Sequence, residues 1–196
     1  MGSAQFKTPA SAFTNWSTTN LASTRAPQCP VSGVNTTLTS FNSNFSISKT
    51  VLAFSDPVNN TTNAKHILSA RARYLFTITN NAGGAADSGT IVIADPIPTN
   101  TQLFVGDLGV AGSGPIRFTQ GTPTSVLSYT FSSLASATGD VSFSNNSSTS
   151  YVDTPVNTGG FDANVTNISI NPNNAFACST TCSTPTAQFE FDVRIK

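Results

Sequence analysis

The chain has 196 residues, nine Lys plus Arg against nine Asp plus Glu, and a formal net charge of zero. Because only 9% of the residues are charged, the chain lacks the basic surface that binds phosphate backbones or anionic membranes, and nucleic acid is not expected as a partner. Ser, Thr and Asn supply 74 residues and Phe supplies 14. No run of 18 apolar residues predicts a membrane span. A net charge near zero favours association between copies.

Residues 1–44 contain Pro, many Ser and Thr, and scattered apolar residues, and no helix or strand period holds there for more than a few positions. We therefore expect an extended N-terminal arm at 1–44 and one β-domain at 45–196. Such an arm either links domains or adds itself as a strand to a neighbouring subunit. In the second case the residues expected to insert are Phe6, Phe13, Leu21 and Leu38.

Alternation of apolar and polar residues predicts strands in the β-domain. It is clearest at residues 70–79 and 189–196, where the charged residues of the second segment are expected to share an outer face. Further strands are expected at 45–53, 90–94, 102–105, 116–119, 127–131, 141–144 and 165–170, and Asp95 before Pro96 is expected to begin a turn. No amphipathic helix competes, so the sequence predicts an all-β, antiparallel sandwich.

Four segments carry a family resemblance: Ile47–Val51, Tyr74–Asn81 with the following Gly-Gly-Ala-Ala-Asp turn, Asp95–Thr101 and Phe189–Ile195. Together they resemble the repeat domain of bacterial and archaeal surface proteins known as domain of unknown function eleven. The resemblance covers about residues 46–196 and implies an Ig-like sandwich used as a wall, stalk or filament module. Related surface domains carry Lys–Asn isopeptide bonds between the first and last strands. Lys49 fits the first half, but the last strand has Glu190 and Asp192 and no Asn, so no such bond is expected.

The chain has three cysteines. Cys178 and Cys182 lie in one polar loop and are expected to form a local disulfide in an oxidising compartment, which leaves Cys29 free or available for a crosslink between subunits. The alternative pairing joins Cys29 to one of the other two and fastens the arm to the domain. The first residues lack the apolar core of a secretory signal, so export requires either a removed signal or another route.

Catalytic chemistry has little support in the sequence. There is one histidine, His66, and no nucleophile-elbow or phosphate-loop pattern. Neither a cofactor nor a metal is expected, although Ca²⁺ could be bound by loop carboxylates such as those of Asp56, Asp87, Asp107 and Asp162. The Asn-x-Ser/Thr sequons permit attached glycans and lie at Asn15, Asn35, Asn44, Asn59, Asn60, Asn145, Asn146, Asn164 and Asn167.

These observations predict a non-enzymatic structural subunit of an extracellular filament or pilus-like fibre at the cell surface. It is expected to form a homopolymer in which the arm of one copy pairs with a sheet edge of the next. The alternative is a surface adhesion or carbohydrate-binding module, in which aromatic side chains such as Trp16 or Tyr151 stack on sugars. Trp16 lies in the expected arm and would be a poor rigid platform.

Overall fold

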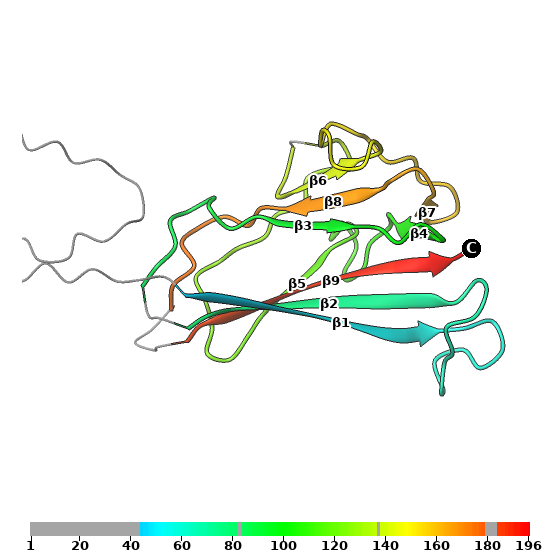
Figure 1. Ribbon diagram of the computed structural model, residues 1–196, viewed down its shortest axis with the longest axis horizontal. Helices are drawn as coiled ribbons and strands as arrows, with labels where there is room; N and C mark the ends of the chain where they lie inside the picture. Colours follow the sequence, from blue (N-terminus) through cyan, green and yellow to red (C-terminus); the bar gives the residue numbers. More distant parts are fainter. Residues whose placement is uncertain (1–43, 82–83, 137, 179–183) are drawn as a thin grey trace, which may run out of the picture. The chain divides into compact units, whose positions relative to one another are not determined.

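The computed structural model describes residues 44–81, 84–136, 138–178 and 184–196, which lie within one compact unit, Ser43–Lys196. The described residues form nine β-strands and no helix, and every strand pairing is antiparallel. The predicted all-β class is therefore confirmed. The strands form two sheets that lie as layers, an arrangement consistent with a β-sandwich (Figure 1).

The larger sheet is built around two ten-residue strands, β2 (Arg71–Asn80) and β9 (Thr186–Ile195). Its order is β1-β2-β9-β4-β7, with β1 at Phe45–Ser55, β4 at Thr101–Phe104 and β7 at Phe161–Asp162. The strand β5 (Arg117–Gln120) also pairs with β9, beyond the stretch of β9 that pairs with β4. Within the described residues β1 pairs only with β2, so it is an edge strand.

The smaller sheet has three strands in the order β3-β8-β6, with β3 at Ile93–Pro96, β8 at Asn167–Ile170 and β6 at Val141–Ser144. In the described part of the chain β3 pairs only with β8, so β3 is the edge of this sheet. Each of these strands has only four residues. The smaller sheet is thus shorter and has fewer strands than the sheet it faces.

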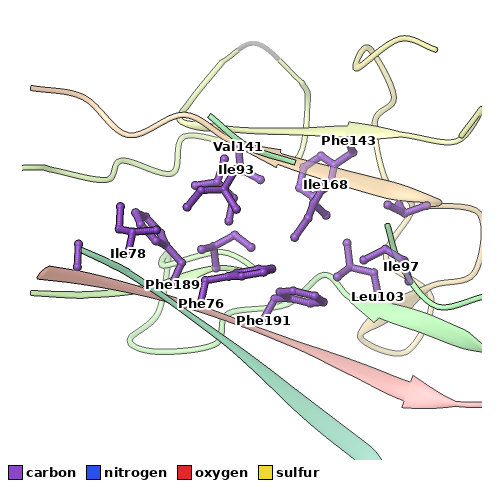
Figure 2. Close-up of a cluster of buried hydrophobic side chains, with 14 of the residues drawn as sticks. Phe76, Ile78, Ile93, Ile97, Leu103, Val141, Phe143, Ile168, Phe189 and Phe191 are labelled. Atoms are coloured by element: carbon purple, nitrogen blue, oxygen red, sulfur yellow. The ribbon is translucent and has the colours of Figure 1, made fainter. Parts of the chain in front are cut away.

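The core lies between the two sheets (Figure 2). The alternation predicted for residues 70–79 and 189–196 is confirmed, because alternate residues of β2 and β9 point into this core. Phe189, Phe191 and Val193 of β9 are fully buried, as are Phe143 and Ile168 of the smaller sheet. Burial of each large apolar side chain contributes about 1.5–3 kcal/mol, so the core of the domain is built from apolar packing.

Three local expectations are wrong. Residues 127–131 form no strand, and only an isolated bridge between Ser128 and Asn173 occurs there. Asp95 begins no turn but lies inside β3. Asp192, expected on a solvent-facing row, is fully buried because its strand is central and neighbouring side chains cover its outer face.

Candidate functional site

The strand β1 has an inward-facing row of side chains that the smaller sheet does not cover. The register places Phe45, Ile47 and Val51 opposite Asn80, Ile78 and Tyr74 of β2, and directly opposed residues share one face of a sheet. Ile78 is 5% exposed, yet its partner Ile47 is 57% exposed. Phe45 and Val51 are 41% and 50% exposed. No residue of β1 belongs to the core cluster, so this edge of the larger sheet extends beyond the core.

An open apolar groove lies at the start of this row, with a volume of about 240 Å³. We call it the β1 groove, and it is lined by Phe45, Ser46, Ile47, Ile78, Thr90, Ile91, Val92, Ile93 and Phe176. Seven of these nine residues are apolar and none is charged. The ring of Phe45 stacks on that of Phe176, with centroids 5.7 Å apart. The groove therefore reaches from the edge strand of one sheet to that of the other and suits an apolar side chain.

An ion pair crosses the same open side of the domain. Lys49, two residues after Ile47 in the inward row, donates from Nζ to both carboxylate oxygens of Asp95 in β3, at 2.8 and 2.6 Å. The ammonium group also lies 4.6 Å from the centre of the Tyr74 ring. Burial and the nearby charge of Asp95 raise the pKa of Tyr74. The pair joins the two edge strands and separates the β1 groove from Val51.

Among the residues that the structure describes, the edge strands bring unpaired backbone to this open side. The strand β1 has 11 residues and a single neighbour among the described strands, so its other edge offers N–H and C=O groups to an added strand. Natural proteins often blunt such edges with an inward-pointing charge or a proline, and Lys49 and Pro96 are residues of these kinds on β1 and β3. Most of the inward row is nevertheless apolar. This geometry suits the addition of a β-strand to the free edge.

A second polar cluster lies on the other face of the larger sheet. The buried carboxylate of Asp192 accepts hydrogen bonds from Nη2 of Arg71 at 2.7 Å and from Nε of Arg73 at 2.7 Å. These hydrogen bonds raise the pKa of Arg73. The guanidinium carbons of Arg73 and Arg71 lie 3.9 Å from the ring centre of Phe54 and 4.3 Å from that of Phe104. The carboxylate of Asp192 is held by both arginines, and Nε of Arg71 is the one buried polar side-chain atom of these three residues that has no hydrogen-bond partner among the described residues. We interpret the cluster as structural.

Three of the four loop carboxylates considered as Ca²⁺ ligands accept hydrogen bonds from backbone N–H groups, and Asp87, the fourth, is exposed. Asp56 binds the N–H groups of Asn59, Lys65 and Val58, which lower its pKa to about 2. Asp107 binds the N–H groups of Gly112 and Gly114, which also lower its pKa. Asp162 likewise holds two N–H groups. In the described part of the chain, no three His, Cys, Asp or Glu side chains are grouped to hold a metal.

Most of the residues singled out in the sequence for assembly lie outside the described residues: Phe6, Phe13, Trp16, Leu21, Cys29, Leu38 and Cys182. Cys178 is described, is partly buried, and is disulfide-bonded. Its pairing with Cys182 stays a prediction. Tyr151 is also partly buried. Nowhere in the described ranges is a helix long and apolar enough to cross a membrane.

No sequence pattern marks the residues of the β1 groove as a site. The alternation of residues 45–53 does place Phe45 and Ile47 on an inward row, but it gives no sign that this row lacks a cover. Phe176 and Ile91 come from irregular segments, and no local pattern brings them next to β1.

Comparison of the chain with protein-family models, curated proteins and solved structures finds no match. The resemblance to the surface-protein repeat domain therefore stays a prediction. The β1 groove and the edge strands beside it are the features of the described structure that bear on function.

Proposed function

We propose that the protein is a non-enzymatic structural subunit of an extracellular filament or pilus-like fibre. In this proposal the N-terminal arm, residues 1–44, leaves its own domain and pairs as an added strand with a neighbouring copy. The observation that carries the proposal is the uncovered inward row of β1, in which Phe45, Ile47 and Val51 are each at least 41% exposed. A strand from outside the domain would bury this row and pair with a free edge.

The composition of the chain favours self-assembly over a monomeric state. With 9% charged residues and zero formal net charge, copies of the chain repel each other little. Each copy carries both an arm and an acceptor, so the contact is head-to-tail and continues as a helical filament unless it closes into a ring. Main-chain hydrogen bonds supply general affinity, and alternate side chains fix the register of the added strand.

The disulfide at Cys178 supports an extracellular location, because disulfides persist in oxidising compartments. The two facing antiparallel sheets suit the Ig-like architecture that the resemblance implies, and we include that architecture in the proposal. Cys29 belongs to the arm segment of the sequence, and in this proposal it is available to crosslink neighbouring subunits once the arm is bound.

Electron microscopy of negatively stained protein tests the proposal. We expect fibres from the full chain and monodisperse particles from a version that lacks residues 1–44. Far-UV circular dichroism of both proteins establishes that the shortened chain keeps its β-structure. Fibres from the shortened chain would contradict a role for the arm, and the absence of fibres from the full chain across concentrations and salt conditions would contradict the filament itself.

A further inference from the structure

The segment preceding the domain contains one stretch that matches the open side of β1. By hydropathy alone this segment has no sustained strand period, but when small side chains are counted as compatible with an enclosed row, residues 4–12 alternate along their whole length. One row has the small or apolar residues Ala4, Phe6, Thr8, Ala10 and Ala12, and the other has Gln5, Lys7, Pro9 and Ser11. Alternation of this kind is the pattern of a half-buried strand. Proline is tolerated on an edge strand, where its missing N–H can face solvent.

We infer that the β1 groove of one copy receives residues 4–12 of a second copy, with the ring of Phe6 in the groove. This inference rests on the proposed function and assigns its donor and acceptor. The groove of about 240 Å³ exceeds the cavity of about 150 Å³ that holds a benzene ring in another protein. An aromatic side chain therefore fits, and the walls that it meets are the apolar side chains of Ile47, Ile78 and Ile93.

The ion pair between Lys49 and Asp95 sets the register. Lys49 follows Ile47 by two residues on the inward row, and Thr8 follows Phe6 by two residues on the donor row. A donor parallel to β1 with Phe6 beside Ile47 thus brings a hydroxyl to the level of the ion pair, and brings Ala10 to Val51. Another large apolar residue in place of Thr8 would press against the charged pair. Lys7 belongs to the opposite row and faces away from Lys49.

The chain is long enough for a neighbour to be the source of the segment. The connecting residues 13–44 reach roughly 110 Å when extended, against about 36 Å for the whole of β1. They can therefore span to an adjacent copy. The near-zero net charge lowers the barrier to bringing two copies together.

Two full-length variants test the inference. Phe6→Asp disables the donor, and Ile47→Lys disables the acceptor at a position that is 57% exposed and so tolerates a charge in the folded domain. The matched controls are Val34→Asp, at an apolar arm residue outside the donor segment, and Leu52→Lys, on the opposite face of β1 and 63% exposed. We expect fibres from the wild-type chain and both controls, and none from either test variant.

A mixture of the two disabled variants gives the decisive measurement. The donor of Ile47→Lys can enter the groove of Phe6→Asp, but the resulting pair cannot extend. We expect light scattering to show a capped dimer with twice the 20.4 kDa mass of one chain, whereas each variant alone is monomeric. Circular dichroism checks that each variant folds, and Ile47→Ser replaces Ile47→Lys if the lysine variant does not.

The outcomes separate this inference from the proposed function. Fibres that persist in Phe6→Asp or Ile47→Lys but vanish when residues 1–44 are removed would overturn the assigned donor or acceptor and leave the filament role standing. A mixture that stays monomeric would overturn donation between copies through this groove, as would evidence that Phe6 occupies the groove of its own chain. A wild-type chain that forms no oligomer would overturn both proposals.

Discussion

Replacement of Asp192 by Asn removes the charge at the centre of the larger sheet and almost nothing else. The carboxylate is fully buried and accepts hydrogen bonds from Arg71 at 2.7 Å and from Arg73 at 2.7 and 3.0 Å. The amide has nearly the same volume, so no cavity forms. It has one acceptor oxygen in place of two, and its NH₂ group faces guanidinium donors. The variant therefore measures the cost of removing the charged carboxylate that both arginines bind, while Arg73 keeps Glu190 at 3.8 Å as a second acidic neighbour.

The magnitude follows from burial. Removal of one partner of a buried ion pair costs about 3–5 kcal/mol, because the other charge stays desolvated. The side chains of Arg71 and Arg73 are 30% and 14% exposed, so water partly solvates them and the lower end of that range applies. We expect a loss of about 3 kcal/mol in the free energy of unfolding. For a domain of this size each kcal/mol shifts Tm by about 2–4 °C, which gives a fall of about 6–12 °C.

Equilibrium denaturation in urea, followed by far-UV circular dichroism, measures this loss, and an unchanged m value shows that both proteins unfold in the same way. The matched control is Asp87→Asn, the same change at an exposed position, which should alter the free energy of unfolding by less than about 0.5 kcal/mol. A loss below about 1 kcal/mol for Asp192→Asn would show that the arginines do not depend on this carboxylate.

Three further predictions concern single groups. Asp56 has a pKa of about 2 because the backbone N–H of Asn59 and other donors bind its carboxylate. Its contribution to stability is therefore complete above about pH 4 and is lost as the pH falls through 2. NMR titration of the carboxyl carbon measures this pKa. The buried hydroxyl of Tyr129 has no hydrogen-bond partner in the described structure, so Tyr129→Phe should raise stability in urea by about 1 kcal/mol, and a loss would reveal a missed partner. Peptide mapping without reduction should find Cys178 joined to Cys182, and any other partner would refute the local pairing.

The sequence predicts the faces of β2 and β9 because alternation is a local signal and both strands cross the middle of the larger sheet. It misplaces Asp95 because Asp before Pro is a common turn signal, whereas β3 is an edge strand on which a missing N–H is tolerated. The burial of Asp192 also could not be predicted from the local sequence, since it depends on arginines 119 and 121 positions away.

Only part of the candidate site could be predicted, because its other part depends on contacts between residues that are distant in the sequence. Strand alternation assigns Ile47 an inward orientation, but whether anything lies over it depends on how many strands the opposite sheet has. Phe176 reaches the groove from a segment without a strand pattern, so its contact with Phe45 is a product of the whole fold. A period of two residues carries no information about such a partner.

The open side of the domain also suggests how the exposed apolar edge of β1 could bind a strand without causing non-specific aggregation. An isolated inward-pointing lysine would repel any apolar strand, because burial of its charge is costly. In this fold Asp95 neutralises Lys49 across the gap between the sheets. An incoming strand would therefore meet a neutral ion pair rather than an unpaired positive charge. Apolar side chains are accepted beside Ile47 and Val51, but a polar or small one is needed between them. In the proposed assembly the ion pair would therefore make a general apolar edge selective for both the sequence and the register of the donated strand.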